Sequence, residues 1–312
     1  MRLFGFGGGN SGDREAERAR QERQEASRRS LEQGGLPLNA IDRLREQAAR
    51  QGTPGHLFTG DLSVKELTLV HQAGYEPLGQ VMGSSIYHVG WQWMPTWSGS
   101  SGELEVLTQA FYQARHLALG RLQQEAALLG ATGVVGVRLE RKEYEWGAGM
   151  LEFAAIGTAI READVPPANV SGVAPFVSDL SGKEFWMLRQ TGYRPVGFAV
   201  GNCTYYQVPT WRTQNAMTGG FFGGAWQNQE LTDFTQAVYN ARALAMRRME
   251  QEARAVGAEG IVGADIQVEM EPREINENRT DMLYHFTAIG TAIAIYTGRW
   301  PAFSVLNTVS LK

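Results

Sequence analysis

Cysteine is almost absent from this 312-residue chain, which contains only Cys203. A single cysteine excludes an intramolecular disulfide framework, and it excludes a metal site built from two or four thiolates of one chain. Charge of one sign is also scarce, because 29 basic and 33 acidic residues leave a formal net charge of −4. That balance provides no electrostatic footprint for nucleic acid, so we expect no nucleic-acid partner.

Long apolar runs are missing as well. No stretch approaches the roughly 18 uninterrupted apolar residues of a membrane-spanning helix, so no span is expected. The glycine-rich residues 1–9 are too short for the apolar region of a signal peptide, and a cytoplasmic location is the expectation. Glycine itself is abundant: the chain has 37, about 12% where about 7% is usual.

The chain contains an internal sequence repeat. Phe58–Glu66 returns as Phe176–Glu184, 118 positions later. Glu103–Gly136 returns as Glu230–Gly263 at an offset of 127, and 19 of these 34 positions are identical. Two copies of one domain follow. The repeat divides the chain into a charged N-terminal segment, a first domain, a linker, a second domain and a C-terminal tail, with boundaries at 1–56, 57–163, 164–175, 176–296 and 297–312.

Both copies predict the same elements. Asp61–Leu67 predicts a capped helical turn, and residues 78–89 alternate as a strand does. Glu103 to about Leu129 predicts a helix of about 40 Å that ends at Gly130. Two further strands follow in each copy. The fold class is therefore α+β, two tandem copies of a small antiparallel sheet with one long helix packed across it.

The N-terminal segment has a different character. In residues 10–34 arginine and glutamate interleave, which favours a solvated, partly helical tail; the alternative is a helix that docks a protein partner. Residues 39–50 carry apolar side chains on one face and predict a short amphipathic helix packed on a neighbour.

A two-part motif in each copy resembles a known family. Glu125–Gly136 followed by Ala155–Ala159, and again Glu252–Gly263 followed by Gly290–Ala292, is similar to the YbjQ-like domain, whose family name includes heavy-metal binding. The resemblance covers most of the chain. It implies a dodecin-like fold and, from single-domain relatives that form pentamers, a homo-oligomeric ring. Only this resemblance makes a divalent or heavy metal a candidate cofactor.

The repeat also tests for a metal site within one chain. The candidate ligands are not duplicated, because His88 corresponds to Tyr206 and Cys203 corresponds to Ser85. One thiolate and five scattered imidazoles do not provide the ligand set that a soft-metal site within one chain needs. The alternative left open is a heavy-metal-binding or metal-sensing protein in which Cys203 or His88 of several subunits converge across interfaces.

Some polar residues do survive duplication. Tyr112 and Arg115 recur as Tyr239 and Arg242, three positions apart and so on one helix face. They predict hydrogen bonds on the helix surface or at a subunit interface, and the alternative is a polar ligand site between subunits.

A second duplicated pair has i,i+4 spacing. Arg121 and Glu125 recur as Arg248 and Glu252, and such a pair contributes only a few tenths of a kcal/mol if exposed. The acidic stretch Glu269–Asp281 predicts a solvated hairpin rather than a calcium site.

Aromatic residues gather after the first strand. Trp91 and Trp93 predict an aromatic face packed on the sheet or another subunit, and the alternative is a pocket for a flat ligand. No nucleophile–base pair has supporting context, so no enzyme is expected. The sequence as a whole predicts a non-enzymatic protein that assembles with copies of itself into a ring or binds a ligand there.

Overall fold

The computed structural model describes residues 10–88, 100–143, 150–218, 228–276 and 279–296. The helices are α1 (Asn10–Glu32), α2 (Leu38–Arg50), α3 (Val64–Gln72), α4 (Glu105–Leu128), α5 (Ala168–Ser171), α6 (Gly182–Gln190), α7 (Trp211–Thr218) and α8 (Thr232–Ala255). The strands are β1 (Tyr75–His88), β2 (Gly102–Glu103), β3 (Gly133–Glu143), β4 (Met150–Glu162), β5 (Phe176–Val177), β6 (Tyr193–Gln207), β7 (Gly260–Asn276) and β8 (Arg279–Ile295).

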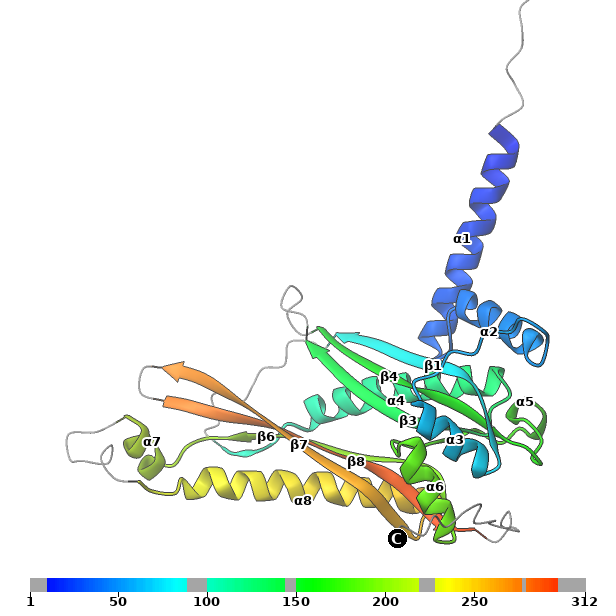
Figure 1. Ribbon diagram of the computed structural model, residues 1–312. Coiled ribbons are helices and arrows are strands. Elements are labelled where there is room, and N and C mark those ends of the chain that lie inside the picture. Colours follow the sequence, from blue (N-terminus) through cyan, green and yellow to red (C-terminus); the bar gives the residue numbers. More distant parts are fainter. Residues whose placement is uncertain (1–9, 89–99, 144–149, 219–227, 277–278, 297–312) are drawn as a thin grey trace, which may run out of the picture.

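The strands form two sheets, one for each copy of the repeat. The first has the order β1-β4-β3-β5 and the second the order β2-β6-β8-β7. In each sheet the three long strands are antiparallel, and the helix that precedes the last two of them packs on the first strand. Figure 1 shows α8 lying along β6, while α4 lies against the first sheet and also reaches β6. The predicted α+β class with two tandem copies is confirmed.

Each sheet also receives a two-residue strand from the other half of the chain. β5 follows the predicted linker but pairs in parallel with β3 of the first sheet. β2 precedes α4 but pairs antiparallel with β6 of the second sheet. The two sheets are therefore joined through main-chain hydrogen bonds as well as through side chains.

One glycine in each copy allows the long helix to lie directly on the first strand. A Cβ atom at Gly83 would lie 2.0 Å from the carbonyl oxygen of Ala118, and one at Gly201 would lie 1.8 Å from that of Ala245. Real Cβ atoms do not approach backbone so closely, so only glycine permits this packing. The two contacts occupy corresponding positions of the repeat.

The predicted helix ends are confirmed in both copies. Gly130 and Gly257 take left-handed conformations, with φ of +77° and +74°, directly after α4 and α8. Ala131 then donates to the carbonyl of Ala126 at 2.9 Å, which closes a Schellman motif. At their N-termini, α3 and α6 carry matching capping boxes centred on Ser63 and Ser181.

The N-terminal segment forms two helices. α1 projects from the body of the molecule (Figure 1), and nearly all its described side chains are exposed. α2 is amphipathic as predicted: Leu44 is fully buried, and Ile41 and Ala48 pack against the same core as α4. No helix in the described part of the chain is long and apolar enough to cross a membrane.

The prediction of a solvated acidic hairpin is wrong at Asp281. This residue on β8 is fully buried, where its carboxylate pairs with Arg279 at 2.6 Å and accepts a hydrogen bond from the hydroxyl of Tyr206. Burial and this acidic partner raise the pKa of Tyr206 to about 12. A buried carboxylate is tolerated here because a cation and a hydroxyl satisfy it.

Candidate functional site at the interface between the repeats

The duplicated Arg–Glu pair bonds the backbone of the first strand in each repeat. In the first repeat, Oε2 of Glu125 accepts the Met82 N–H at 2.9 Å, and Nη1 of Arg121 donates to the Ser84 carbonyl at 2.6 Å. These main-chain groups lie on the edge of β1 that has no neighbouring strand. The two side chains therefore satisfy hydrogen-bonding groups that an edge strand otherwise exposes.

The second repeat uses the corresponding atoms. Glu252 accepts the Val200 N–H at 2.7 Å, and Arg248 donates to the Asn202 carbonyl at 2.8 Å. From sequence spacing alone, each is an i,i+4 pair that contributes a few tenths of a kcal/mol if exposed. In the structure both carboxylates belong to mostly buried residues and bond a strand, so their duplication has a structural reason.

The outer face of β6 is covered by the first repeat. Val200, Asn202 and Thr204 point away from α8 and are 2% exposed or less, because α4 lies over them. We call these three residues, together with the edge-bonding Arg248 and Glu252, the receiving face of the second repeat.

Arg115 of α4 makes the central contact with this receiving face. It is 1% exposed, and its Nη2 donates to Oδ1 of Asn202 at 2.9 Å. Thr108 completes the contact: its carbonyl accepts from Nδ2 of Asn202 at 3.1 Å, and its hydroxyl accepts the Thr204 N–H at 2.9 Å. Burial lowers the pKa of Arg115 to about 10, which leaves it cationic at neutral pH.

Acidic and aromatic side chains complete the contact at the strand edge. Glu103 binds Arg248 through both carboxylate oxygens, at 2.6 and 2.9 Å. Tyr112 donates its hydroxyl to Glu252, and Nε2 of His116 lies 3.1 Å from the same carboxylate oxygen. We call the first-repeat residues that make these contacts the inserting face: Glu103, Thr108, Tyr112, Arg115 and His116.

The two edge-bonding carboxylates differ in their electrostatics. Burial works against the charged form of Glu252, but hydrogen bonds from His116, Tyr112 and the Val200 N–H outweigh it and lower the pKa. Burial raises the pKa of Glu125, which has only the Met82 N–H and Arg43 to offset it. The difference follows from the inserting face, which reaches Glu252 but has no counterpart on Glu125.

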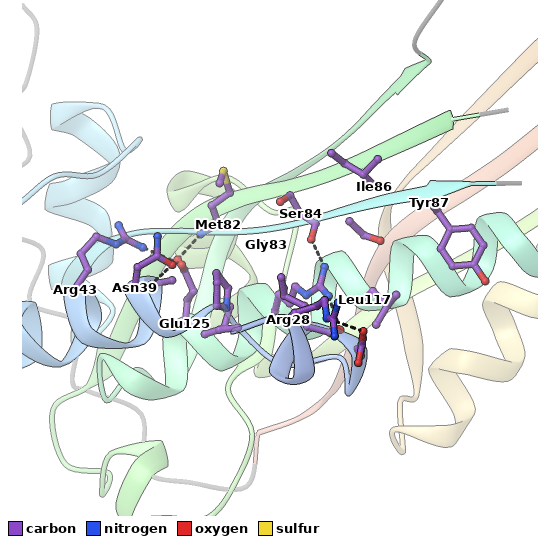
Figure 2. Close-up of a pocket in the computed structure, with 17 residues that line it drawn as sticks. Arg28, Asn39, Arg43, Met82, Gly83, Ser84, Ile86, Tyr87, Leu117 and Glu125 are labelled. Atoms are coloured by element: carbon purple, nitrogen blue, oxygen red, sulfur yellow. Dashed lines mark hydrogen bonds and ion pairs between the residues drawn. The ribbon is translucent and has the colours of Figure 1, made fainter. Parts of the chain in front are cut away.

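The receiving face of the first repeat is open at the side chains of β1 that point away from α4. Met82 and Ile86 are 48% and 64% exposed, whereas their counterparts Val200 and Thr204 are 1% and 0% exposed. Figure 2 shows Met82 and Ile86 on the side of β1 away from α4. A cavity of about 780 Å³ lies between this strand and the helices α1 and α2.

The inserting face of the second repeat is open too. Tyr239 is 61% exposed and Arg242 is exposed, and neither makes a hydrogen bond or ion pair with the described residues. The structure thus places the predicted residues Tyr112 and Arg115 in a buried interface and leaves their duplicates at the surface.

The candidate metal ligands are not gathered. Cys203 is 1% exposed among Ala241, Ala245 and Phe286, and burial raises its pKa to about 12. His88 is exposed at the end of β1. In the ranges that the structure describes, no three His, Cys, Asp or Glu side chains are grouped so that they could hold a metal ion. Trp91 and Trp93 lie outside those ranges.

Sequence reasoning missed Asn202, a partner of the inserting face, and Thr108, one of its members. Asn202 carried no signal, because its counterpart in the first repeat is Ser84. Thr108 and Glu103 did carry one, since both recur in the second repeat as Thr235 and Glu230. Duplication marked these residues, but only the fold shows that they act on the other repeat.

Comparison with known proteins agrees with the architecture. The family described as "Putative heavy-metal-binding" (YbjQ) matches residues 76–163 and 216–296. An encapsulin nanocompartment protein of Mycobacterium tuberculosis is 43% identical over 215 residues, which cover 68% of this chain and 78% of that protein. A UPF0145 protein of Mycobacteroides abscessus is 36% identical over 85 residues, 26% of this chain and 78% of its own length. A UPF0145 protein of Clostridium perfringens is 39% identical over 59 residues, 19% of this chain and 54% of its own length. The chain therefore belongs to the YbjQ family, and it carries two of the family's domains in tandem.

Proposed function

We propose that this protein is a non-enzymatic assembly protein that forms a closed ring from copies of itself. The observation that supports the proposal is that each repeat leaves one face without a partner, and that these two faces are of complementary kinds. The inserting face of the first repeat is buried on the receiving face of the second, while the first repeat keeps an open receiving face and the second an open inserting face. Two such chains can join head to tail, and head-to-tail contacts produce rings when the rotation closes.

The chemistry of the duplicated residues supports a structural role. Arg121, Glu125, Arg248 and Glu252 all bond strand backbone, and Arg115 bonds a neutral amide. A need for these hydrogen bonds explains why the residues are present in both repeats, and no catalysed reaction is required to explain it. The proposal therefore assigns the protein no catalytic step.

The relative from Mycobacterium tuberculosis suggests a setting for this ring. That relative is named as an encapsulin nanocompartment protein. We extend the proposal to this chain: its assembled form works in the cytoplasm together with the components of such a compartment. Size fractionation of cell lysate tests this part, because the chain should then sediment with large particles rather than as a free ring.

Native mass spectrometry of the full chain tests ring formation. The expected spectrum contains one main closed multiple of 34.4 kDa. Replacing Tyr239 with Phe and Arg242 with Ala should weaken association by about tenfold or more, because both groups belong to the inserting face. Arg254→Ala, an exposed change on the same helix, is the matched control. A wild-type chain that stays monomeric at tens of micromolar would overturn the proposal.

A further inference from the structure

Arg121 and Arg248 are duplicates, but only Arg248 has a carboxylate partner. Arg248 binds both oxygens of Glu103, and this contact raises its pKa. Arg121 donates to three main-chain carbonyls, those of Gly35, Ser84 and Leu31, and burial lowers its pKa. Within the described ranges it pairs with no acid. The first repeat thus holds a partly buried cation at the position where the second repeat binds an acid.

The matching acid is present at the other end of the chain. Glu230 is the duplicate of Glu103; it is exposed and makes no ion pair in the part of the chain that the structure describes. The next residue already has the backbone shape of the bound form: Leu231 has φ −86° and ψ 79°, against −89° and 80° for Leu104. Docking would therefore need little reordering of this segment.

The edge of β1 can accept the same strand that β6 accepts. In the second sheet Gly102 pairs with Tyr206 and Glu103 with Tyr205. The corresponding residues of β1 are His88 and Tyr87, and β1 is the outer strand of its sheet. An added strand supplies main-chain hydrogen bonds, while its side chains determine which partner fits.

The chain's own N-terminal segment now occupies part of this place. The last turn of α1 offers the Leu31 carbonyl to Arg121 at 3.1 Å, and the turn between α1 and α2 offers the Gly35 carbonyl at 3.0 Å. Arg43 of α2 binds Glu125 at 2.9 Å, which Figure 2 shows beside the Met82 contact. In the second repeat Glu103 and Tyr112 bind the corresponding arginine and glutamate. A neutral carbonyl binds a guanidinium less strongly than a carboxylate does, so a second chain can compete for Arg121.

We propose, building on the proposed ring, that residues 229–231 of a second copy of this chain add to the edge of β1 and place the Glu230 carboxylate on Arg121. The turn between α1 and α2 holds this place until the second copy docks. The Glu230 carboxylate of the second copy then competes with the carbonyls of Leu31 and Gly35 for the guanidinium of Arg121.

A charge swap on the full chain tests the docking contact. Glu230→Arg should weaken association by about tenfold or more, because it places a second cation against the partly buried Arg121. Arg121→Glu should weaken it as well, and the double variant should recover most of the loss. Glu250→Arg, on an exposed face of α8, is the matched control and should leave association unchanged. Because Glu230 makes no ion pair within the described chain, its variant should keep the wild-type unfolding midpoint when both are measured at a concentration where single chains predominate.

A second variant tests the competition by the turn. Gly34 has φ +79°, so Gly34→Val strains the α1–α2 turn and should strengthen association several-fold. Amide hydrogen exchange of residues 33–36 should be faster in the assembled protein than in single chains. Weaker association of Gly34→Val, or unchanged exchange, would overturn the role of the turn. Wild-type rings that tolerate Glu230→Arg would overturn the docking contact alone, whereas a wild-type monomer would overturn the proposed function itself.

Discussion

Arg115 on α4 donates a hydrogen bond from Nη2 to Oδ1 of Asn202 on β6, at 2.9 Å, with both side chains at most 2% exposed. We expect Arg115→Ala to lower the free energy of unfolding by about 2–4 kcal/mol, because it removes buried volume and leaves a buried amide oxygen without its donor. Chemical denaturation at a concentration where single chains predominate measures this loss.

The repeat provides the control for this substitution. Arg242→Ala alters the duplicate of Arg115, which is exposed in the single chain, and should change the same free energy by no more than about 0.5 kcal/mol. Equal losses for the two variants would contradict the buried interface between the repeats.

Glutamine variants of the two edge-bonding carboxylates should respond to pH with opposite signs. The pKa of Glu252 is lowered in the folded state, so its stabilisation is fully present above the ordinary value of 4.5 and is lost as the pH falls through the lowered pKa. The cost of Glu252→Gln should therefore grow between pH 3.5 and 7.

The pKa of Glu125 is raised, so the folded state favours its protonated form, and that stabilisation is lost as the pH rises through the raised pKa. The cost of Glu125→Gln should therefore shrink over the same range. Urea unfolding at several pH values measures both slopes. Parallel slopes would show that the inserting face does not distinguish the two carboxylates.

The close contact of helix and strand predicts a strong penalty at one glycine in each repeat. Gly83→Ala and Gly201→Ala would each force a methyl group into a helix carbonyl, so each should destabilise the fold by about 2–3 kcal/mol. Gly120→Ala is the control: it lies in α4 with open space around its Cβ position, and it should stabilise by about 0.5–1 kcal/mol. Thermal unfolding followed by circular dichroism compares the three.

Cys203 should be nearly inert in the folded chain. Because burial raises its pKa to about 12, the reactive thiolate is scarce at pH 8, and alkylation should be slower than in the unfolded protein by about a hundredfold or more. Mass spectrometry after timed exposure to iodoacetamide measures the rates with and without denaturant.

The same thiol is one of the two candidate ligands in the alternative of a metal-binding protein, so its removal tests that alternative. Zinc, copper and cadmium stoichiometries should be equal and negligible in the wild type and in a variant that combines Cys203→Ser with His88→Ala. Binding that disappears in this variant would support the alternative in which these two residues of several subunits share a metal.

Much of the architecture follows from local sequence signals. The duplication is visible because 19 of 34 positions repeat, and the helix ends follow from glycines that can adopt positive φ. The burial of Leu44 on one face of α2 likewise follows from its helical spacing. These features depend on neighbours along the chain, which the sequence shows directly.

No local sequence signal predicts which groups the duplicated polar side chains bond. Tyr112 and Tyr239 have closely similar sequence contexts, yet one bonds Glu252 and the other is 61% exposed. Arg121 and Glu125 looked like a surface pair because their spacing is known from sequence, while the strand edge that they bond is not.

By itself, then, the sequence determined what each repeat is: an α+β unit with one long capped helix, present in two copies after a charged N-terminal segment. Only the tertiary structure decided how the repeats differ, because burial depends on which surface meets which. Two copies of one unit placed head to tail bury one pair of faces and leave the other pair without a partner repeat, and the turn between α1 and α2 lies on one of these remaining faces.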